Sequence, residues 1–145
     1  MYRDTVTVFN CKRGIDGDIW YPTILHDVNL NMDKGSVIKQ YGAESQDNAI
    51  LFVRYTKDGD TIKVGSNIWL PPKEWQGVSD HAGKFTFDDN GDFFWLGEWS
   101  GSVAYEGAYG SQTFYEYMLA NYDFVFAVTS VNYLSVIPHF EVTGK

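Results

Sequence analysis

The sequence has one cysteine, no long apolar run and no basic residue over much of its C-terminal part. Cys11 is the only cysteine among 145 residues, so the chain cannot form an internal disulfide or a cysteine-rich zinc site. Its apolar runs stop at about five residues, whereas a membrane-spanning helix needs about 20. The N-terminus also lacks the apolar segment of a secretory signal peptide. We expect a protein that folds in a reducing cytosol.

Basic residues are missing from one part of the chain. The net charge is −8, and residues 85–144 hold eight acidic residues but no Lys or Arg. Binding to phosphates depends on Lys and Arg, so this part is expected to repel nucleic acid. The acidity either serves solubility alone or forms a functional surface that faces DNA. The candidate residues for such a surface are Asp88, Asp89, Asp92, Glu98 and Glu106.

Short segments rich in β-branched and aromatic residues occur along the whole sequence. We expect strands at residues 5–9, 19–30, 49–55, 61–64, 124–131 and 136–143. Pro22 favours an edge, a bulge or two shorter strands in the second segment. No linker or internal repeat divides the chain. The prediction is a single β-rich domain over residues 1–145, a β-barrel or sandwich with one short packed helix around residues 113–122.

Turn and helix signals divide these segments. Asp58-Gly59 and Asn90-Gly91 each predict a hairpin turn, the second joining residues 84–88 to residues 93–97. Thr113 and Glu116 have the spacing of a capping box, which predicts the helix at 113–122. A second helix is expected at residues 33–41, and a short helical turn after Pro72.

No motif in the sequence predicts catalysis, a metal or a cofactor. Asp88-x-Asn90-x-Asp92 resembles the start of a calcium loop, but Phe93 and Trp99 stand where such a loop has Gly and Glu. The hairpin explains the same residues without an ion. The three histidines are far apart and have no ligand spacing, and no nucleophile elbow is present. We therefore expect no catalytic residue, no bound metal and no cofactor.

The segment from residue 97 to residue 110 is rich in Gly, Ser and Tyr and predicts a long exposed loop. Its glycines suggest too flexible a setting for core packing, so its large rings are expected to bind a partner. These candidate partner-binding residues are Trp95, Trp99, Tyr105 and Tyr109. Aromatic platforms beside Glu98 and Glu106 also leave open sugar binding or glycoside hydrolysis.

The two ends of the chain resemble a known class of viral proteins. Residues 4–10 (DTVTVFN) and 20–28 (WYPTILHDV) stand near the start, and residues 128–131 (VTSV) and 139–145 (HFEVTGK) at the end. Together they resemble small structural proteins of the head–tail connector of tailed phages that infect Gram-positive bacteria. The proteins of this class include minor capsid, head–tail connector and head-completion proteins. The resemblance covers about 45 residues.

The resemblance implies a non-enzymatic subunit of the phage neck, most specifically a head-closure ring. Such a subunit is a small β-barrel in the virion that contacts itself, the portal or adaptor, and the tail terminator. DNA would pass through the ring without specific binding, which suits an acidic lumen. The alternatives are another head–tail or tail component, or a carbohydrate-binding β-sandwich that uses the four aromatic residues named above. An enzyme ranks third.

Overall fold

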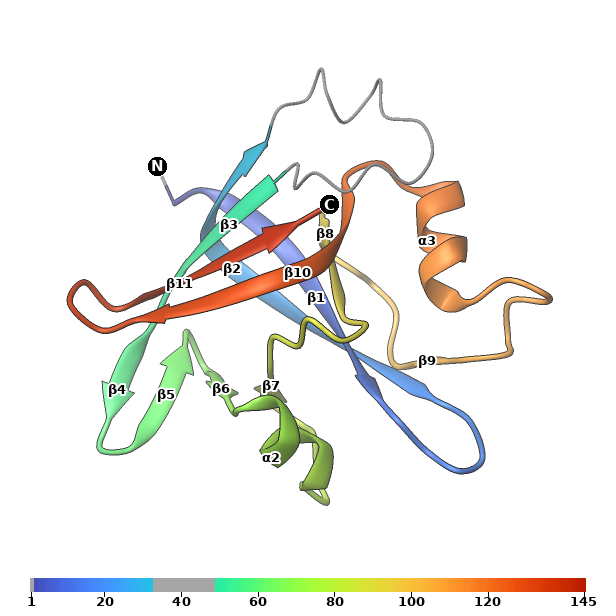
Figure 1. Cartoon of the computed structure of the whole chain (residues 1–145), viewed down its shortest axis with the longest axis horizontal. Coiled ribbons are helices and arrows are strands. Elements are labelled where there is room, and N and C mark those ends of the chain that lie inside the picture. Colours follow the sequence, from blue (N-terminus) through green and yellow to red (C-terminus); the bar gives the residue numbers. More distant parts are fainter. Residues whose placement is uncertain (1, 33–48) are drawn as a thin grey trace.

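The computed structural model describes residues 2–32 and 49–145 and is built mainly of strands (Figure 1). The expected mainly-β class, with a short helix near residue 113, is confirmed. The helix expected at residues 33–41 lies outside the described residues. The strands are β1 (Asp4–Lys12), β2 (Ile19–Met32), β3 (Ala49–Arg54), β4 (Thr56–Asp58), β5 (Thr61–Val64), β6 (Asn67–Trp69), β7 (Lys84–Phe85), β8 (Phe93–Leu96), β9 (Ala104–Tyr105), β10 (Val125–Leu134) and β11 (His139–Gly144), and the helices are α2 (Pro72–Gly77) and α3 (Phe114–Asn121).

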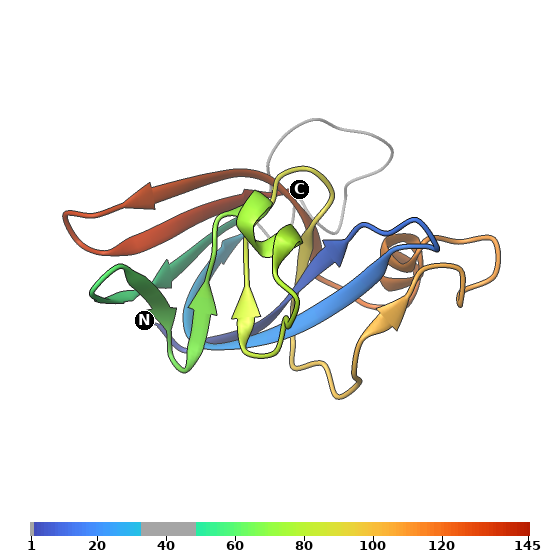
Figure 2. The same ribbon diagram turned by 90° about the horizontal axis from the view of Figure 1, so that it is seen from below.

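Six strands close into an antiparallel barrel. Their order is β1-β8-β10-β11-β3-β2, and the pairing of β1 with β2 completes the ring. The short strand β9 attaches to the start of β2. Closure gives most of these strands a hydrogen-bonded neighbour on both sides, which removes exposed sheet edges. Figures 1 and 2 show the turn between β10 and β11 projecting on the same side of the molecule as β4 and reaching slightly beyond it.

The barrel interior is filled by side chains that alternate along the strands. In β3 and β11 every second residue is buried, as expected when one face of a strand points inward. We call this interior the barrel core. Its buried residues are Val6, Val8, Leu25, Val28, Ala49, Leu51, Val53, Tyr55, Val64, Phe85, Phe87, Phe94, Phe126, Val128, Phe140 and Val142.

A second hydrophobic cluster lies on the outside of β1, β8 and β10. Phe93 and Phe94 are adjacent in β8, yet both are fully buried, because one faces this second cluster and the other faces the barrel core. Helix α3 and the segment after β8 cover the outer face. We call this the outer cluster. Its buried residues are Phe9, Cys11, Trp20, Phe93, Ala104, Phe114, Met118 and Val125.

Helix α3 begins as the capping box predicts. The Thr113 hydroxyl accepts the backbone N–H of Glu116 at 3.1 Å, and the Glu116 carboxylate accepts the backbone N–H of Thr113 at 2.9 Å. Both bonds satisfy amide donors that the first helical turn leaves without partners. Phe114 and Met118 then point into the outer cluster, so the cap orients the apolar face of the helix.

A small sheet, ordered β4-β5-β6-β7, carries α2 at one end of the barrel. Its first hairpin turns at Asp58-Gly59 as expected, with Gly59 at a φ of 63°. The second predicted hairpin is wrong. Strand β7 pairs in parallel with β6, whereas β8 pairs with β1 and β10. The turn at residues 89–91 exists, but it redirects the chain from the small sheet to the barrel.

Pro22 and Pro138 lie at positions where their lack of a backbone N–H does not interrupt the hydrogen bonds between strands. Pro22 pairs with Phe9 on β1, and the opposite side of β2 has no described partner strand between residues 21 and 28. The predicted edge position of Pro22 is therefore confirmed. Pro138 precedes β11, so Val136 and Ile137 belong to a turn instead of the strand predicted at residues 136–143.

Candidate functional site

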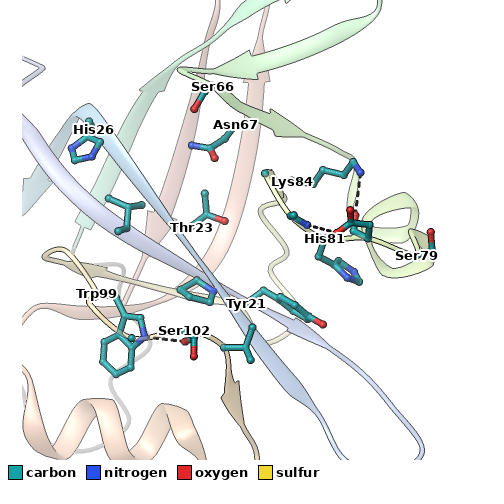
Figure 3. Close-up of a pocket in the computed structure, with 17 residues that line it drawn as sticks. Tyr21, Thr23, His26, Ser66, Asn67, Ser79, His81, Lys84, Trp99 and Ser102 are labelled. Carbon is teal, nitrogen blue, oxygen red and sulfur yellow. Dashed lines mark hydrogen bonds between the residues drawn. The ribbon is translucent and has the colours of Figure 1, made fainter.

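A surface groove of about 780 Å³ lies beside β2. In Figure 3, Trp99 and Ser102 lie on one side of β2, and Ser79, His81 and Lys84 lie on the other. The groove is lined by Tyr21, Pro22, Thr23, Ile24, His26, Ser66, Asn67, Ser79, Asp80, His81, Ala82, Gly83, Lys84, Trp99, Gly101, Ser102 and Val103.

The rings of Tyr21 and His81 form one wall of the groove, and both pack against the buried Trp75 ring. The Tyr21 and His81 rings are parallel, with centroids 4.6 Å apart, and His81 also lies 4.4 Å from the Trp75 ring. The His81 Nε2 is 3.0 Å from the Trp75 carbonyl oxygen. Burial lowers the pKa of His81 despite this hydrogen bond, so its ring is mainly uncharged at neutral pH. His81 therefore packs as an uncharged aromatic ring in the wall of the groove.

Trp99 forms the opposite wall and is held by hydrogen bonds at both ends. The fully buried Thr7 hydroxyl accepts the Trp99 backbone N–H at 3.0 Å and donates to the Gly97 carbonyl at 2.9 Å. The Trp99 Nε1 donates to the Ser102 carbonyl at 3.2 Å. These bonds tie the segment after β8 to β1, so the ring enters the groove from a fixed backbone.

The expectation that glycines leave the segment at residues 97–110 unpacked is wrong for its first part, residues 97–101. A Cβ on Gly97 would stand 2.5 Å from the Trp95 ring, and one on Gly101 would stand 2.7 Å from the Trp99 Nε1. These glycines are needed because the tryptophan rings lie directly on the backbone. Trp95, Trp99 and Tyr109 are half-buried against the outer cluster, and Tyr105 alone of the four candidates is exposed.

One residue of the predicted acidic surface, Asp92, is buried, and another, Asp88, is paired with a basic side chain. Asp92 is only 2% exposed, so its assignment to a DNA-facing surface is wrong. It accepts hydrogen bonds from Asn10 Nδ2 and the Cys11 backbone N–H, at 2.7 and 2.9 Å. Asp88 is half-buried with Arg13 Nη1 at 4.0 Å, and Asp89 and Glu98 are exposed. A basic residue remote in sequence therefore lies at this patch.

Glu106 has a structural task in this conformation. Its two carboxylate oxygens accept hydrogen bonds from Trp20 Nε1 and from the Phe114 backbone N–H, each at 2.9 Å. The second bond places a negative charge at the N-terminus of α3, which the helix dipole favours. Glu106 thereby joins β2 to α3 across the outer cluster, and this engagement disfavours its use with Glu98 as a catalytic pair.

The carbohydrate-binding alternative needs open ring faces, and the structure offers few. The Trp99 ring packs edge-on against Phe9, Phe114 and Tyr122, with centroids 5.4, 5.9 and 6.1 Å away. The Trp95 ring packs against Tyr122 at 5.0 Å. These rings are largely committed to the protein itself, so the arrangement favours packing over a sugar platform.

Within residues 2–32 and 49–145, no three His, Cys, Asp or Glu side chains form a group that could hold a metal ion. The residues of the calcium-like stretch diverge, because Asp92 points inward while Asp88 Oδ1 accepts the Asn90 backbone N–H at 2.9 Å. No described helix is long and apolar enough to cross a membrane.

A second surface, which the sequence did not predict, lies at the turn between β10 and β11. Val136 is 95% exposed and Ile137 71% exposed, with Leu134 beside them at 37%. Turns favour Gly, Asn, Asp and Ser, so three aliphatic side chains at one tip are unusual. Pro138 is the residue that could have indicated this turn. A proline is disfavoured inside a strand that is paired on both sides, so it favours a last strand that begins after it.

The fold and these two surfaces define a small closed β-barrel protein with an external aromatic cluster, a lateral groove and a projecting apolar hairpin. The chain belongs to a family of unknown function (DUF6751), whose model matches residues 1–145. Searches of curated proteins and of solved structures found no match.

Proposed function

We propose that the protein is a non-enzymatic structural subunit of a phage particle, a head-closure ring subunit in the neck that joins the portal or adaptor to the tail. The observation that carries this proposal is the closed barrel with a projecting apolar hairpin. Such a design places the binding surface outside the core, where a neighbouring chain covers it.

The segments that carry the resemblance to phage connector proteins support the proposal by their positions. Residues 4–10 lie in β1, residues 20–28 in β2, residues 128–131 in β10 and residues 139–144 in β11. All four strands belong to the six-stranded barrel. The resemblance therefore follows the barrel framework, and the divergent middle of the chain supplies the small sheet and the covering of the outer cluster.

The charge distribution supports passage of DNA without specific binding. Asp89 and Glu98 are exposed, and residues 85–144 contain no Lys or Arg. Arg13 lies at this patch but is paired with Asp88, so the surface gains little free energy from counterion release on DNA. An acidic ring lumen would therefore let DNA slide past. Portal, adaptor and tail-terminator proteins would be the other partners, and the virion neck the location.

The test is to locate the chain in particles of the phage or prophage whose genome encodes it. A small epitope tag placed after Lys145 should label the head–tail junction in electron micrographs of purified particles. Deleting the gene should leave DNA-filled heads and free tails that do not join. Absence of the chain from purified particles, or normal particles after deletion, would reject the proposal.

A further inference from the structure

The hairpin tip formed by Leu134, Val136 and Ile137 is an apolar surface with no covering from the described residues. Val136 and Ile137 lie in the turn and are 95% and 71% exposed to solvent. Their removal from water would be favourable, because apolar burial scales with the area covered. Figure 1 shows this tip at the far left, away from α2 and β9.

Tyr55 holds the hairpin rigidly at the base of its tip. The Tyr55 hydroxyl donates to the Leu134 carbonyl at 2.8 Å, and the Tyr55 backbone N–H donates to the Pro138 carbonyl at 3.3 Å. The Tyr133 ring stacks on Tyr55 and Trp69, with centroids 5.1 and 6.0 Å away. Both strands of the hairpin are thus fixed before binding, which lowers the entropic cost of association.

The groove beside β2 has the features that such a tip requires. Four consecutive β2 residues, 21–24, line it, as when a strand presents its edge and not one face. No described strand pairs with this side of β2 between residues 21 and 28. Pro22 lacks an N–H and the register of β1 and β2 shifts near Asp27. The usable edge is therefore short, which suits a hairpin tip better than a long strand.

Apolar side chains and backbone groups are combined in this groove. Ile24 and Val103 line it together with the Trp99 ring, and Thr23 and Ser102 add polar groups. A surface that combines apolar side chains with polar groups is typical of protein–protein contacts. Within the segment at residues 97–110, Trp99 and Val103 line the groove.

We propose that the hairpin tip of one copy docks in the groove of a second copy, so that each contact joins two different surfaces of the same chain. The tip is the turn between β10 and β11, whereas the groove is lined by β2, the segment before β7 and the segment after β8. The two surfaces belong to different elements of one fixed barrel, so one copy does not bring its own two surfaces together. Contacts between two different surfaces of identical chains generate closed rings or open filaments. The proposal specifies the contact between ring subunits and rests on the proposed function for the expectation that the assembly closes.

A cysteine-pair experiment tests which surfaces meet. Two single variants, Ile137→Cys at the tip and Val103→Cys in the groove, are mixed at high concentration with a mild added oxidant. We expect a covalent dimer from the mixture and much less from either variant alone. Cys11 can stay, because burial and the nearby Asp18 and Asp92 raise the pKa of its thiol to about 12, which leaves it little reactive thiolate. Equal dimer from Ile137→Cys alone would reveal tip-to-tip contact and overturn the proposal, as would no dimer in the mixture.

A matched pair of isoleucine variants tests the strength of the contact. Ile137→Asp should weaken self-association, measured by sedimentation equilibrium, by roughly tenfold or more. Ile15→Asp is the control, because Ile15 is fully exposed and lines neither surface. Circular dichroism confirms that both variants fold. Equal self-association of the two variants would reject the contact.

These results separate this proposal from the function. Dimer formation by a chain that is absent from particles would reject the neck function alone. If the chain is found at the head–tail junction but its cysteine variants do not cross-link, only the contact between the hairpin tip and the groove is rejected.

Discussion

The barrel core and the outer cluster are filled by different kinds of side chain. Most buried residues of the barrel core are aliphatic and come from alternating strand positions. The outer cluster is dominated by aromatic rings, and every partly buried residue packed against it is Trp or Tyr. Strand hydrogen bonds already fix the segments around the barrel core. The outer cluster joins α3 and residues 97–113 to the sheet, so side-chain contacts must supply most of that cohesion.

The sharpest test of this difference removes one fully buried phenylalanine from each region. Phe114→Ala should cost about 3–5 kcal/mol of unfolding free energy, as should Phe140→Ala, because each leaves a large cavity. The Phe114 ring contacts those of Phe9, Tyr109 and Trp99 at 5.1–5.9 Å. Urea denaturation followed by circular dichroism and by tryptophan fluorescence measures both variants.

The coincidence of the two signals decides whether the regions unfold together. We expect coincident transitions for both variants, since β1, β8 and β10 belong to both regions. A Phe114→Ala protein that loses less than about 1 kcal/mol, while Phe140→Ala loses several, would show that the outer cluster adds little to the stability of the barrel.

Asp92 lies where the chain passes between the two regions, and its burial predicts a pH-dependent stability. Burial raises its pKa to about 7 although Cys11 and Asn10 donate hydrogen bonds to it. Between pH 4 and pH 7 the folded protein therefore holds a proton that the unfolded chain has released. The free energy of unfolding should fall by roughly 3–4 kcal/mol across this range as pH rises.

Asp92→Asn removes the titrating group and serves as the control. The difference in unfolding free energy between the two proteins should change steadily from pH 4 to pH 7 and then level off. Urea titrations at four or five pH values measure it. A difference that stays constant over this range would contradict a raised pKa at Asp92.

Gly97 tests whether tight ring packing holds the segment after β8. Gly97→Ala places a Cβ 2.5 Å from the Trp95 ring, so we expect a loss of about 1–3 kcal/mol from overpacking. Gly77→Ala is the control, since no atom lies within 4 Å of its added Cβ. Thermal melts compare the two. Equal melting temperatures would show that the Trp95 ring moves aside without cost.

The smallest effect is expected at the cap of α3. Thr113→Ala removes the hydroxyl that accepts the Glu116 N–H and should cost about 0.5–2 kcal/mol. Thr113→Ser keeps that acceptor and should recover most of the loss. Denaturant midpoints measure both variants. If Thr113→Ser is as unstable as Thr113→Ala, the hydroxyl is not the source of the stability.

Local features were predictable from the sequence because they depend on residues close together in the chain. The capping box spans four residues, from Thr113 to Glu116. The turn at Gly59 depends on a backbone conformation that glycine adopts without strain. Segments rich in apolar, β-branched and aromatic residues predicted the strands near residues 49–55 and at the C-terminus. The mainly-β class followed from such segments.

The tertiary structure alone decided the features that depend on distant residues. Asp92 is buried because Asn10, 82 residues away, donates to it, and no local pattern distinguishes it from the exposed Asp89. The glycines around Gly97 predict a flexible loop. In the structure the rings of Trp95 and Trp99 pack closely against Gly97 and Gly101, where a Cβ atom would leave no room for them. The apolar hairpin tip and the groove likewise arise only when β2, β10 and β11 take their places in the barrel. Composition and spacing determine which elements form, but long-range packing determines which side chains remain available to a partner.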